Sequence, residues 1–280
     1  MTSAEPTRRA TRQTAVPDVQ SFDRRVLEPN TRDALAGLLL AMADDEFVIG
    51  FWDSEWTGIA PMLEEDVAFS SLAQDELGHA KVWYEMLAVL AGEKADRLAF
   101  GREPEQYHHA HLLDHPRTDW AFSIARRYLY DTADSIRLSA LARSSFKPLS
   151  DVVAKVRREE RYHLLHMDAW LRRLAGHRGE PRDRLVNALD SLADDALSVF
   201  APLAGERLLI DAGVIDAPMA ELCDRWRQQV DGVFADLGLP LLPAGAPQPD
   251  GRSRDPLSES FGWLWSEFTS VHRLEEGVEW

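Results

Sequence analysis

The sequence contains a single cysteine, Cys223, among its 280 residues, so no disulfide can form within the chain. Disulfides are concentrated in secreted and extracellular proteins, and this scarcity therefore indicates a reducing compartment. The sequence also lacks any apolar run of about 18 residues, the length that a membrane-spanning helix requires. Residues 1–22 contain no apolar core of a secretory signal. We therefore expect a cytoplasmic protein with no membrane span.

Basic residues are scarce relative to acidic ones, with 31 Lys and Arg against 47 Asp and Glu, which gives a net charge of −16. A protein that binds nucleic acid needs a basic surface to neutralise phosphates, so we expect no nucleic-acid partner. The hydrophobic content of 45% is sufficient for one large domain with a well-buried core. We expect an N-terminal arm over residues 1–30 and a single helical domain over residues 31–280.

Patterns typical of β-strands are absent, whereas apolar residues recur at the spacing of an α-helix along most of the chain. The four longest helices are predicted over residues 31–56, 62–91, 118–144 and 148–175. Additional helices are predicted nearer the C-terminus, over residues 182–212, 217–237 and 256–274, with a Pro/Gly-rich linker at 240–254. The predicted fold class is all-α, with a four-helix core over about 31–175 and further helices over about 182–275.

Two of the long helices carry the same short motif, Glu-x-x-His, at Glu76–His79 and at Glu160–His163. Residues separated by three positions share one face of a helix, so each motif directs a carboxylate and an imidazole the same way. In both helices these are the polar members of an otherwise apolar stripe. Dinuclear metal proteins of the ferritin-like class have two helices with this motif and two helices with one carboxylate each. The motifs therefore predict a ferritin-like four-helix bundle.

The other two carboxylates must come from the first and third helices. Asp131 is the candidate in the third helix, while Glu46 is the central candidate in the first and Asp45, Asp53 and Glu55 compete with it. An ordinary bundle with acids at its surface is the alternative interpretation. Because a carboxylate in an apolar stripe is costly unless a cation pairs with it, we favour a metal site. The predicted ligands are Glu46, Glu76, His79, Asp131, Glu160 and His163.

Carboxylate oxygens and imidazole nitrogens suit both iron and manganese. We expect two iron ions, with manganese as the alternative. Glu76 and Glu160, or one of these with an outer acid such as Glu46, would bridge the ions, so these three residues are also the candidate catalytic residues. His79 and His163 would each bind one ion.

The surroundings of this site can also be predicted in part. Asp75 and Asp134 are candidates for accepting hydrogen bonds from the ligand imidazoles and so orienting them. Lys81 and Arg161 either pair with the ligand carboxylates or face solvent. A group of histidines over residues 108–115 lies in a predicted loop without a fixed face, and we expect these side chains to be solvated.

Several further stretches carry a resemblance to a known family. They are Ser54-Glu55-Trp56, Ala60-Pro61 with Leu63-Glu64-Glu65-Asp66, Tyr128-Leu129-Tyr130-Asp131, Glu159-Glu160-Arg161-Tyr162-His163 and the terminal Trp280. From about residue 35 to the end, the chain resembles the phenylacetic acid catabolic proteins, the ferritin-like subunits of bacterial phenylacetyl-CoA epoxidase. The body of the chain is most similar to the C subunit of that enzyme. This similarity implies a helical and largely structural partner of the catalytic A subunit.

The ligand positions, by contrast, are similar to those of the A subunit. Gln74-Asp75-Glu76-Leu77-Gly78-His79 resembles its iron-binding motif, and Glu46, Asp131, Glu160 and His163 match its other ligands. The resemblance therefore implies a di-iron oxygenase that acts on phenylacetyl-CoA or another aryl or acyl-CoA thioester. A structural subunit that stabilises a multicomponent monooxygenase is the alternative. The implied partners are a reductase or other electron donor, and either a ferritin-like partner subunit or a second copy in a homodimer.

Overall fold

The computed structural model describes residues 22–245, 254 and 258–274. Within these residues every regular element is a helix, which confirms the all-α, ferritin-like prediction. Most of the expected N-terminal arm and the terminal Trp280 lie outside the described residues. No helix in the described ranges combines the length and the apolar character needed to cross a membrane.

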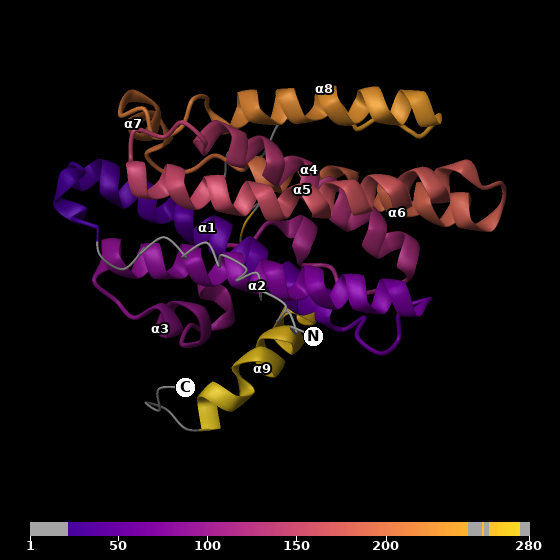
Figure 1. Cartoon of the computed structure of the whole chain (residues 1–280), viewed down its shortest axis with the longest axis horizontal. Coiled ribbons are helices and arrows are strands. Elements are labelled where there is room, and N and C mark those ends of the chain that lie inside the picture. Colours follow the sequence, from indigo (N-terminus) through magenta and orange to yellow (C-terminus); the bar gives the residue numbers. More distant parts are fainter. Residues whose placement is uncertain (1–21, 246–253, 255–257, 275–280) are drawn as a thin grey trace, which may run out of the picture.

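Four long helices form the core and run side by side along the longest axis of the molecule (Figure 1). Helix α1 packs on α2, and α4 packs on α5. Their bounds lie within a few residues of the predicted ones, as expected because the ends of helices are the least regular part of the sequence pattern. They are α1 (Pro29–Ser54), α2 (Leu63–Ala91), α4 (Trp120–Leu141) and α5 (Lys147–Gly176).

Local signals in the sequence account for the ends of these helices. Proline occupies the first turn of α1 and α5, where its missing N–H removes no intrahelical hydrogen bond. The carboxylate of Asp119 caps α4 by accepting a hydrogen bond from the backbone N–H of Phe122 at 2.9 Å. Helix α2 ends at Gly92, whose φ of 75° lies in the left-handed region that glycine tolerates best.

The interior of the bundle is apolar over most of its length and strongly charged in the middle. Helix α1 buries residues on every side because α2, α7 and α9 pack around it. Charged side chains inside a core are rare unless they are paired, so their concentration marks a specialised region. The buried charged residues of α1 and α4 are Asp44, Asp45, Glu46, Asp53, Arg126, Arg127, Asp131, Asp134 and Arg137.

The segment between α2 and α4 is more regular than predicted. It contains α3 (Ala95–Phe100) and two short 3-10 helices, Pro104–Gln106 and His111–Leu113. Arg102 anchors the segment to α1 by donating a hydrogen bond to Asp44 Oδ2 at 3.0 Å.

The expectation of solvated histidines in this segment was wrong. His109 is fully buried and its Nε2 lies 3.1 Å from Asp114 Oδ1. His115 is half-buried, with Nε2 2.7 Å from Asp195 Oδ2. These histidines hold the segment in place, and the described residues do not bring them together as a metal cluster.

The single helix predicted over 182–212 was also wrong. The structure contains α6 (Glu180–Ala196), a 3-10 helix (Leu197–Phe200) and α7 (Glu206–Asp211). Pro202 cannot donate the backbone hydrogen bond that a continuous helix would need. Gly205 has a φ of 75°, and a Cβ atom added there would lie 2.7 Å from the Cβ of Ala34. The break therefore allows the chain to approach α1 closely.

The remaining helices cover the bundle from opposite sides. Helix α8 (Met219–Leu237) packs on α4, and α9 (Glu259–Leu274) packs on α1 and α3. Figure 1 shows α8 at the top of the bundle and α9 crossing beneath it. Apolar residues from both helices join the same hydrophobic core as the four long helices. They enclose the charged region rather than add chemistry of their own.

Candidate metal centre

Helices α2 and α5 bring the two Glu-x-x-His motifs together in the interior. All four motif side chains are buried, and the two imidazole rings lie 6.1 Å apart between centroids. His163 Nδ1 is 3.0 Å from Glu160 Oε1 and 3.1 Å from Glu76 Oε1. His79 Nδ1 is 3.3 Å from Glu160 Oε1. Both imidazoles therefore direct Nδ1 toward the same carboxylate of Glu160.

Helix α1 adds Glu46 to this group. The indole N–H of Trp83 donates a hydrogen bond to Glu46 Oε2 at 2.8 Å, which fixes the carboxylate in the interior. Ligand atoms of Glu46, Glu76 and His79 all lie within 4.8 Å of one another, and we name this set the first triad. Ligand atoms of Glu76, Glu160 and His163 meet the same limit and form the second triad. Glu76 belongs to both.

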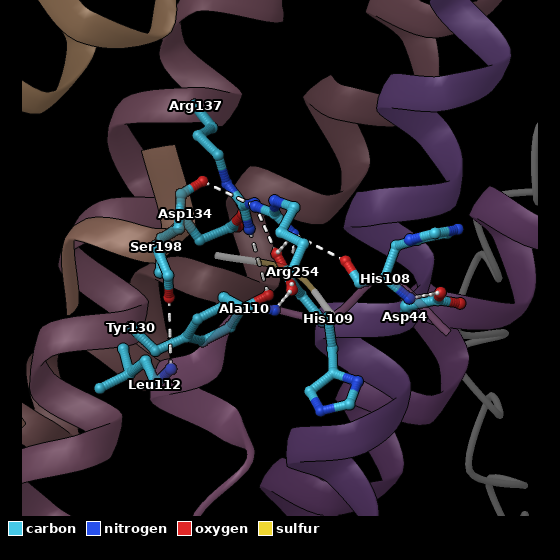
Figure 2. Close-up of polar contacts among 12 residues, drawn as sticks. Asp44, His108, His109, Ala110, Leu112, Tyr130, Asp134, Arg137, Ser198 and Arg254 are labelled. Atoms are coloured by element: carbon cyan, nitrogen blue, oxygen red, sulfur yellow. Dashed lines mark hydrogen bonds and ion pairs between the residues drawn. The ribbon is translucent and has the colours of Figure 1, made fainter. Parts of the chain in front are cut away.

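The competing acids of α1 serve other purposes. Asp45 Oδ2 accepts a hydrogen bond from Arg137 at 2.6 Å, and Asp45 Oδ1 accepts one from Arg254 at 3.0 Å. Figure 2 shows Arg137 and Arg254 converging beside Asp134. Glu55 is only half-buried, with Oε2 3.7 Å from Arg117. The structure thus places Glu46, rather than Asp45 or Glu55, in the triads.

Helix α4 contributes the predicted Asp131 together with a cation that the sequence analysis missed. Asp131 belongs to neither triad; its Oδ1 lies 3.1 Å from Arg127 Nη2. Arg127 Nη1 donates a hydrogen bond to Glu76 Oε1 at 2.6 Å, and Nη2 lies 3.3 Å from His163 Nδ1. The guanidinium group of Arg127 therefore lies against the second triad.

Asp53 contacts the same guanidinium nitrogen, Arg127 Nη1, that binds Glu76. Arg127 Nη1 is 3.3 Å from Asp53 Oδ2, while Arg126 Nη2 is 3.6 Å from Asp53 Oδ1. Arg126 also donates a hydrogen bond to the backbone carbonyl of His115 at 2.6 Å. Burial raises the pKa of Asp53 to about 6 although both arginines oppose this shift. Arg127 thus contacts three buried carboxylates, those of Asp53, Glu76 and Asp131.

Each ligand imidazole is also held from outside by a carboxylate of the facing helix. His79 Nε2 lies 2.8 Å from Glu159 Oε2, and His163 Nε2 lies 3.4 Å from Asp75 Oδ2. Asp75 therefore occupies the orienting position expected of it. Asp134 does not, because it accepts a hydrogen bond from Arg137 at 2.8 Å. Glu159 was missed, although an acid directly before each motif is a visible signal.

Neither Lys81, which follows the first motif, nor Arg161, which lies within the second, enters the site. Lys81 is exposed, and its Nζ lies 4.0 Å from Glu85 on the same helix. Arg161 is exposed on α5. The guanidinium group that contacts the motifs is that of Arg127 on α4 instead.

The donor atoms fit a pair of metal ions. Several are buried and make no hydrogen bond to the described residues, a condition that is costly for a polar group inside a protein. Two of them have a close ion-pair contact instead, Asp131 Oδ1 at 3.1 Å from Arg127 and Glu160 Oε1 at 3.0 Å from His163. Hard carboxylate oxygens combined with imidazole nitrogens are the ligands preferred by iron and manganese in such sites. Asp131 could bind a metal ion only if the guanidinium group of Arg127 moved away from its carboxylate. The unpartnered atoms are Glu46 Oε1, Glu76 Oε2, His79 Nδ1 and both carboxylate oxygens of Asp131 and Glu160.

The protonation of these groups follows from their burial and their neighbours. Burial raises the pKa of Glu46 and Asp131 well above the usual range of a carboxyl group. Burial opposes protonation of His163, yet Glu160, Asp75 and Glu76 together raise its pKa to about 12. Burial likewise disfavours charged His79, but hydrogen bonds to acids raise its pKa well above 6.5. These shifts favour the protonated forms of groups that a metal ion would need deprotonated.

Metal uptake is accordingly expected to release protons. Ligands with raised pKa values hold protons below those values, so raising the pH deprotonates them and strengthens metal binding. The affinity for Mn²⁺ should increase from about pH 6 to about pH 8, by about tenfold per pH unit for each proton released. Indicator dye in weakly buffered solution measures this release during a Mn²⁺ titration. Binding without proton release, at an affinity independent of pH, would contradict these protonation states.

The carboxylates of Asp75 and Glu159, which contact the ligand imidazoles, should influence metal affinity without binding the ion. We expect Asp75→Asn and Glu159→Gln each to lower affinity for Mn²⁺ by about 10–100-fold, because each imidazole loses the partner that orients it. Glu64→Gln is the matched control, since Glu64 is exposed on the same helix as Asp75. Equilibrium titration measures all three. If the first two variants bound as tightly as the control, the cross-helix pairs would have no role in holding the imidazoles.

Comparison with known proteins assigns the chain to a family. Residues 21–280 match the family described as phenylacetic acid catabolic protein. The chain is 28% identical over 249 residues to the C subunit of 1,2-phenylacetyl-CoA epoxidase from Escherichia coli (strain K12), an alignment that covers 88% of this chain and 99% of that protein. It is 24% identical over 163 residues to the A subunit of the same enzyme and organism, covering 57% and 52% respectively. The resemblance seen in the sequence is thereby confirmed, and the chain belongs to the phenylacetic acid catabolic protein family.

Proposed function

We propose that the chain is a metal-binding, ferritin-like subunit of an oxygenase of the phenylacetyl-CoA epoxidase type. The observation that supports this proposal is the pair of buried triads that share Glu76 and retain unsatisfied carboxylate oxygens. Iron is the proposed metal, and manganese would suit the same donors. The proposed ligands are Glu46, Glu76, His79, Asp131, Glu160 and His163.

The proposed roles of the ligands follow from their positions. Glu76 would bridge the two ions because it alone belongs to both triads. Glu160 is a second bridging candidate, since its Oε1 lies near the Nδ1 atoms of both His163 and His79, at 3.0 and 3.3 Å. Glu46 would bind one ion with the orientation that the Trp83 indole imposes. These contacts orient the proposed donors.

Two iron ions in this centre would supply dioxygen activation, with one oxygen atom entering an organic substrate and the other leaving as water, which takes up two electrons from a reductase and two protons from solvent. The chain would contribute the buried carboxylate ligands, which the surrounding apolar side chains shield from bulk water. The proposed substrate class is an aryl or acyl-CoA thioester. Both relatives are named phenylacetyl-CoA epoxidase subunits, so phenylacetyl-CoA is the first compound to test.

The test is oxygen-dependent product formation from phenylacetyl-CoA by the iron-loaded chain with a reductase. A second ferritin-like subunit, or a second copy of this chain, belongs in the assay because both relatives are subunits of a larger enzyme. Glu76→Ala is the control, and we expect it to abolish turnover. Equal turnover in that variant would remove the proposed catalytic role of the centre.

A structural subunit is the second candidate function, and two observations favour it. Arg127 already supplies a positive charge to Glu76 and Asp131, so the buried carboxylates have a partner without any metal. The alignment with the C subunit of the epoxidase also extends over 99% of that relative. Copurification with a second ferritin-like chain, with no metal bound after exposure to Fe²⁺, would establish this function in place of the first.

A further inference from the structure

The buried guanidinium group of Arg127 lies directly beside the second triad. It contacts Glu76 Oε1 at 2.6 Å and Asp131 Oδ1 at 3.1 Å, and it lies 3.3 Å from His163 Nδ1. The side chains of Arg127 and Asp131 are fully buried, and that of Glu76 is 1% exposed. Solvent therefore does not screen these contacts, and the guanidinium group acts as the local cation.

A metal ion bound by the second triad and Asp131 would compete with this guanidinium group. Both positive groups would use the carboxylates of Glu76 and Asp131, and two cations at such short range repel strongly in a buried site. Arg127 contacts two members of the second triad, Glu76 and His163. In the described part of the chain it contacts only one member of the first triad, Glu76. Glu46 is oriented there by the neutral indole of Trp83. The two metal positions are therefore unequal.

The carboxylate of Asp53 is a second possible partner for the guanidinium group of Arg127. Arg127 Nη1 already lies 3.3 Å from Asp53 Oδ2, and both Asp53 oxygens lack hydrogen bonds among the described residues. Asp53 is seven residues after Glu46 on α1, so two helical turns place both side chains on the same face. Arg126 cannot readily replace Arg127 there, because the His115 carbonyl holds it and its nearest contact with Asp53 is 3.6 Å.

We propose that Arg127 is an internal counter-ion that gates the second metal position and so orders the loading of the centre. The first ion enters at Glu46, Glu76 and His79. The second ion enters only as the guanidinium group moves from Glu76 and Asp131 to Asp53. This inference rests on the proposed function, in that it requires the centre to bind metal.

Equilibrium titration of the full-length chain with Mn²⁺ tests this order. Electron paramagnetic resonance measures free Mn²⁺, and elemental analysis counts the bound ions. The wild-type chain is expected to bind in two steps whose affinities differ by at least about tenfold. Arg127→Gln should strengthen the second step by about tenfold or more and leave the first step nearly unchanged. A wild-type chain that binds one ion while this variant binds two would equally support the gate.

Two further variants keep the test decisive if Arg127→Gln does not fold. Asp53→Asn should weaken the second step by about tenfold, because the displaced guanidinium group loses its alternative partner. Arg127→Lys retains a charge but lacks the fork of donors that reaches several carboxylates, so it should strengthen the second step less than the glutamine variant. Arg172→Gln is the control outside the centre, since Arg172 pairs with Asp168 on the exposed side of α5, and we expect it to leave both steps unchanged.

The outcomes separate this inference from the proposed function. Two equal binding steps in the wild-type chain, or a second step that neither Arg127→Gln nor Asp53→Asn changes, would overturn the gate while leaving a metal centre intact. Absence of Mn²⁺ binding in the wild-type chain and in every variant would instead overturn the proposed function. In that case Arg127 would be a permanent structural cation.

Discussion

Replacing Glu76 by glutamine is expected to abolish metal binding at both positions. Glu76 is the one residue shared by the two triads, so the loss of its carboxylate affects both ions. A glutamine side chain keeps the shape but supplies a neutral amide in place of the carboxylate. We expect the affinity for Mn²⁺ to fall by more than about 100-fold, the upper limit for changes to residues that merely orient a ligand. Titration with elemental analysis of the bound ions measures the effect.

Single-triad variants provide the matched comparison for this result. Glu46→Gln should remove the first ion and retain the second, because Glu46 belongs to the first triad alone, whereas Glu160→Gln should weaken binding of the second ion most, because Glu160 belongs to the second triad. Circular dichroism during heating shows whether each variant remains folded. A Glu76→Gln variant that folds and still binds two ions would contradict the shared role of Glu76.

Replacing Arg137 by methionine is expected to lower the free energy of unfolding more than any other substitution proposed for this chain. Its side chain is 2% exposed, and it bridges Asp45 at 2.6 Å and Asp134 at 2.8 Å, with Arg137 and Asp134 labelled in Figure 2. Methionine has a similar length but no charge, so Asp134 loses its cation while Asp45 retains only Arg254. Removing one partner of a buried ion pair typically lowers the free energy of unfolding by about 3–5 kcal/mol.

The matched control for this prediction is Arg172→Met. Arg172 is 48% exposed on α5 and pairs with Asp168 at 2.8 Å, so it resembles Arg137 in chemistry but not in burial. Exposed pairs contribute about 0–1 kcal/mol, and we expect a loss within that range. Urea unfolding followed by tryptophan fluorescence measures both variants. Equal losses would show that the buried network around Asp45 does not stabilise the fold.

The helices and the two motifs could be predicted from the sequence because both depend on a regular repeat. Apolar residues at helical spacing mark the four long helices, and Glu76, His79, Glu160 and His163 interrupt apolar stripes that must face the core. A polar side chain in such a stripe has to find a partner in the interior. The pattern therefore indicated both where these residues lie and why they meet.

The acids of α1 were harder to assign because three of them are consecutive. Successive helical residues point about 100° apart, so Asp44, Asp45 and Glu46 cannot face the same neighbour. In the structure Asp44 faces Arg102, Asp45 faces Arg137, and Glu46 reaches Trp83. The sequence favoured Glu46 without excluding Asp45, since the partners of both come from distant segments.

Arg127 illustrates what the sequence could not reveal directly. Arginine is seldom buried unless it is paired, so an arginine in an amphipathic helix is ordinarily assigned to the solvent side. Arg127 precedes Asp131 by four residues, however, and the two side chains therefore share a face. If Asp131 faces the interior of the bundle, Arg127 on the same face of the helix must face the interior too. The competition between this cation and a second metal became apparent only from the contacts in the interior.

The most direct test of the metal centre is anomalous X-ray diffraction at the iron edge from crystals of the chain loaded anaerobically with Fe²⁺. The proposed centre predicts two peaks about 3.5–4 Å apart. One should lie among Glu46, Glu76 and His79, and the other among Glu76, Glu160 and His163, with Arg127 turned to Asp53. The absence of any peak, with Arg127 still bound to Glu76, would contradict a metal centre in this chain.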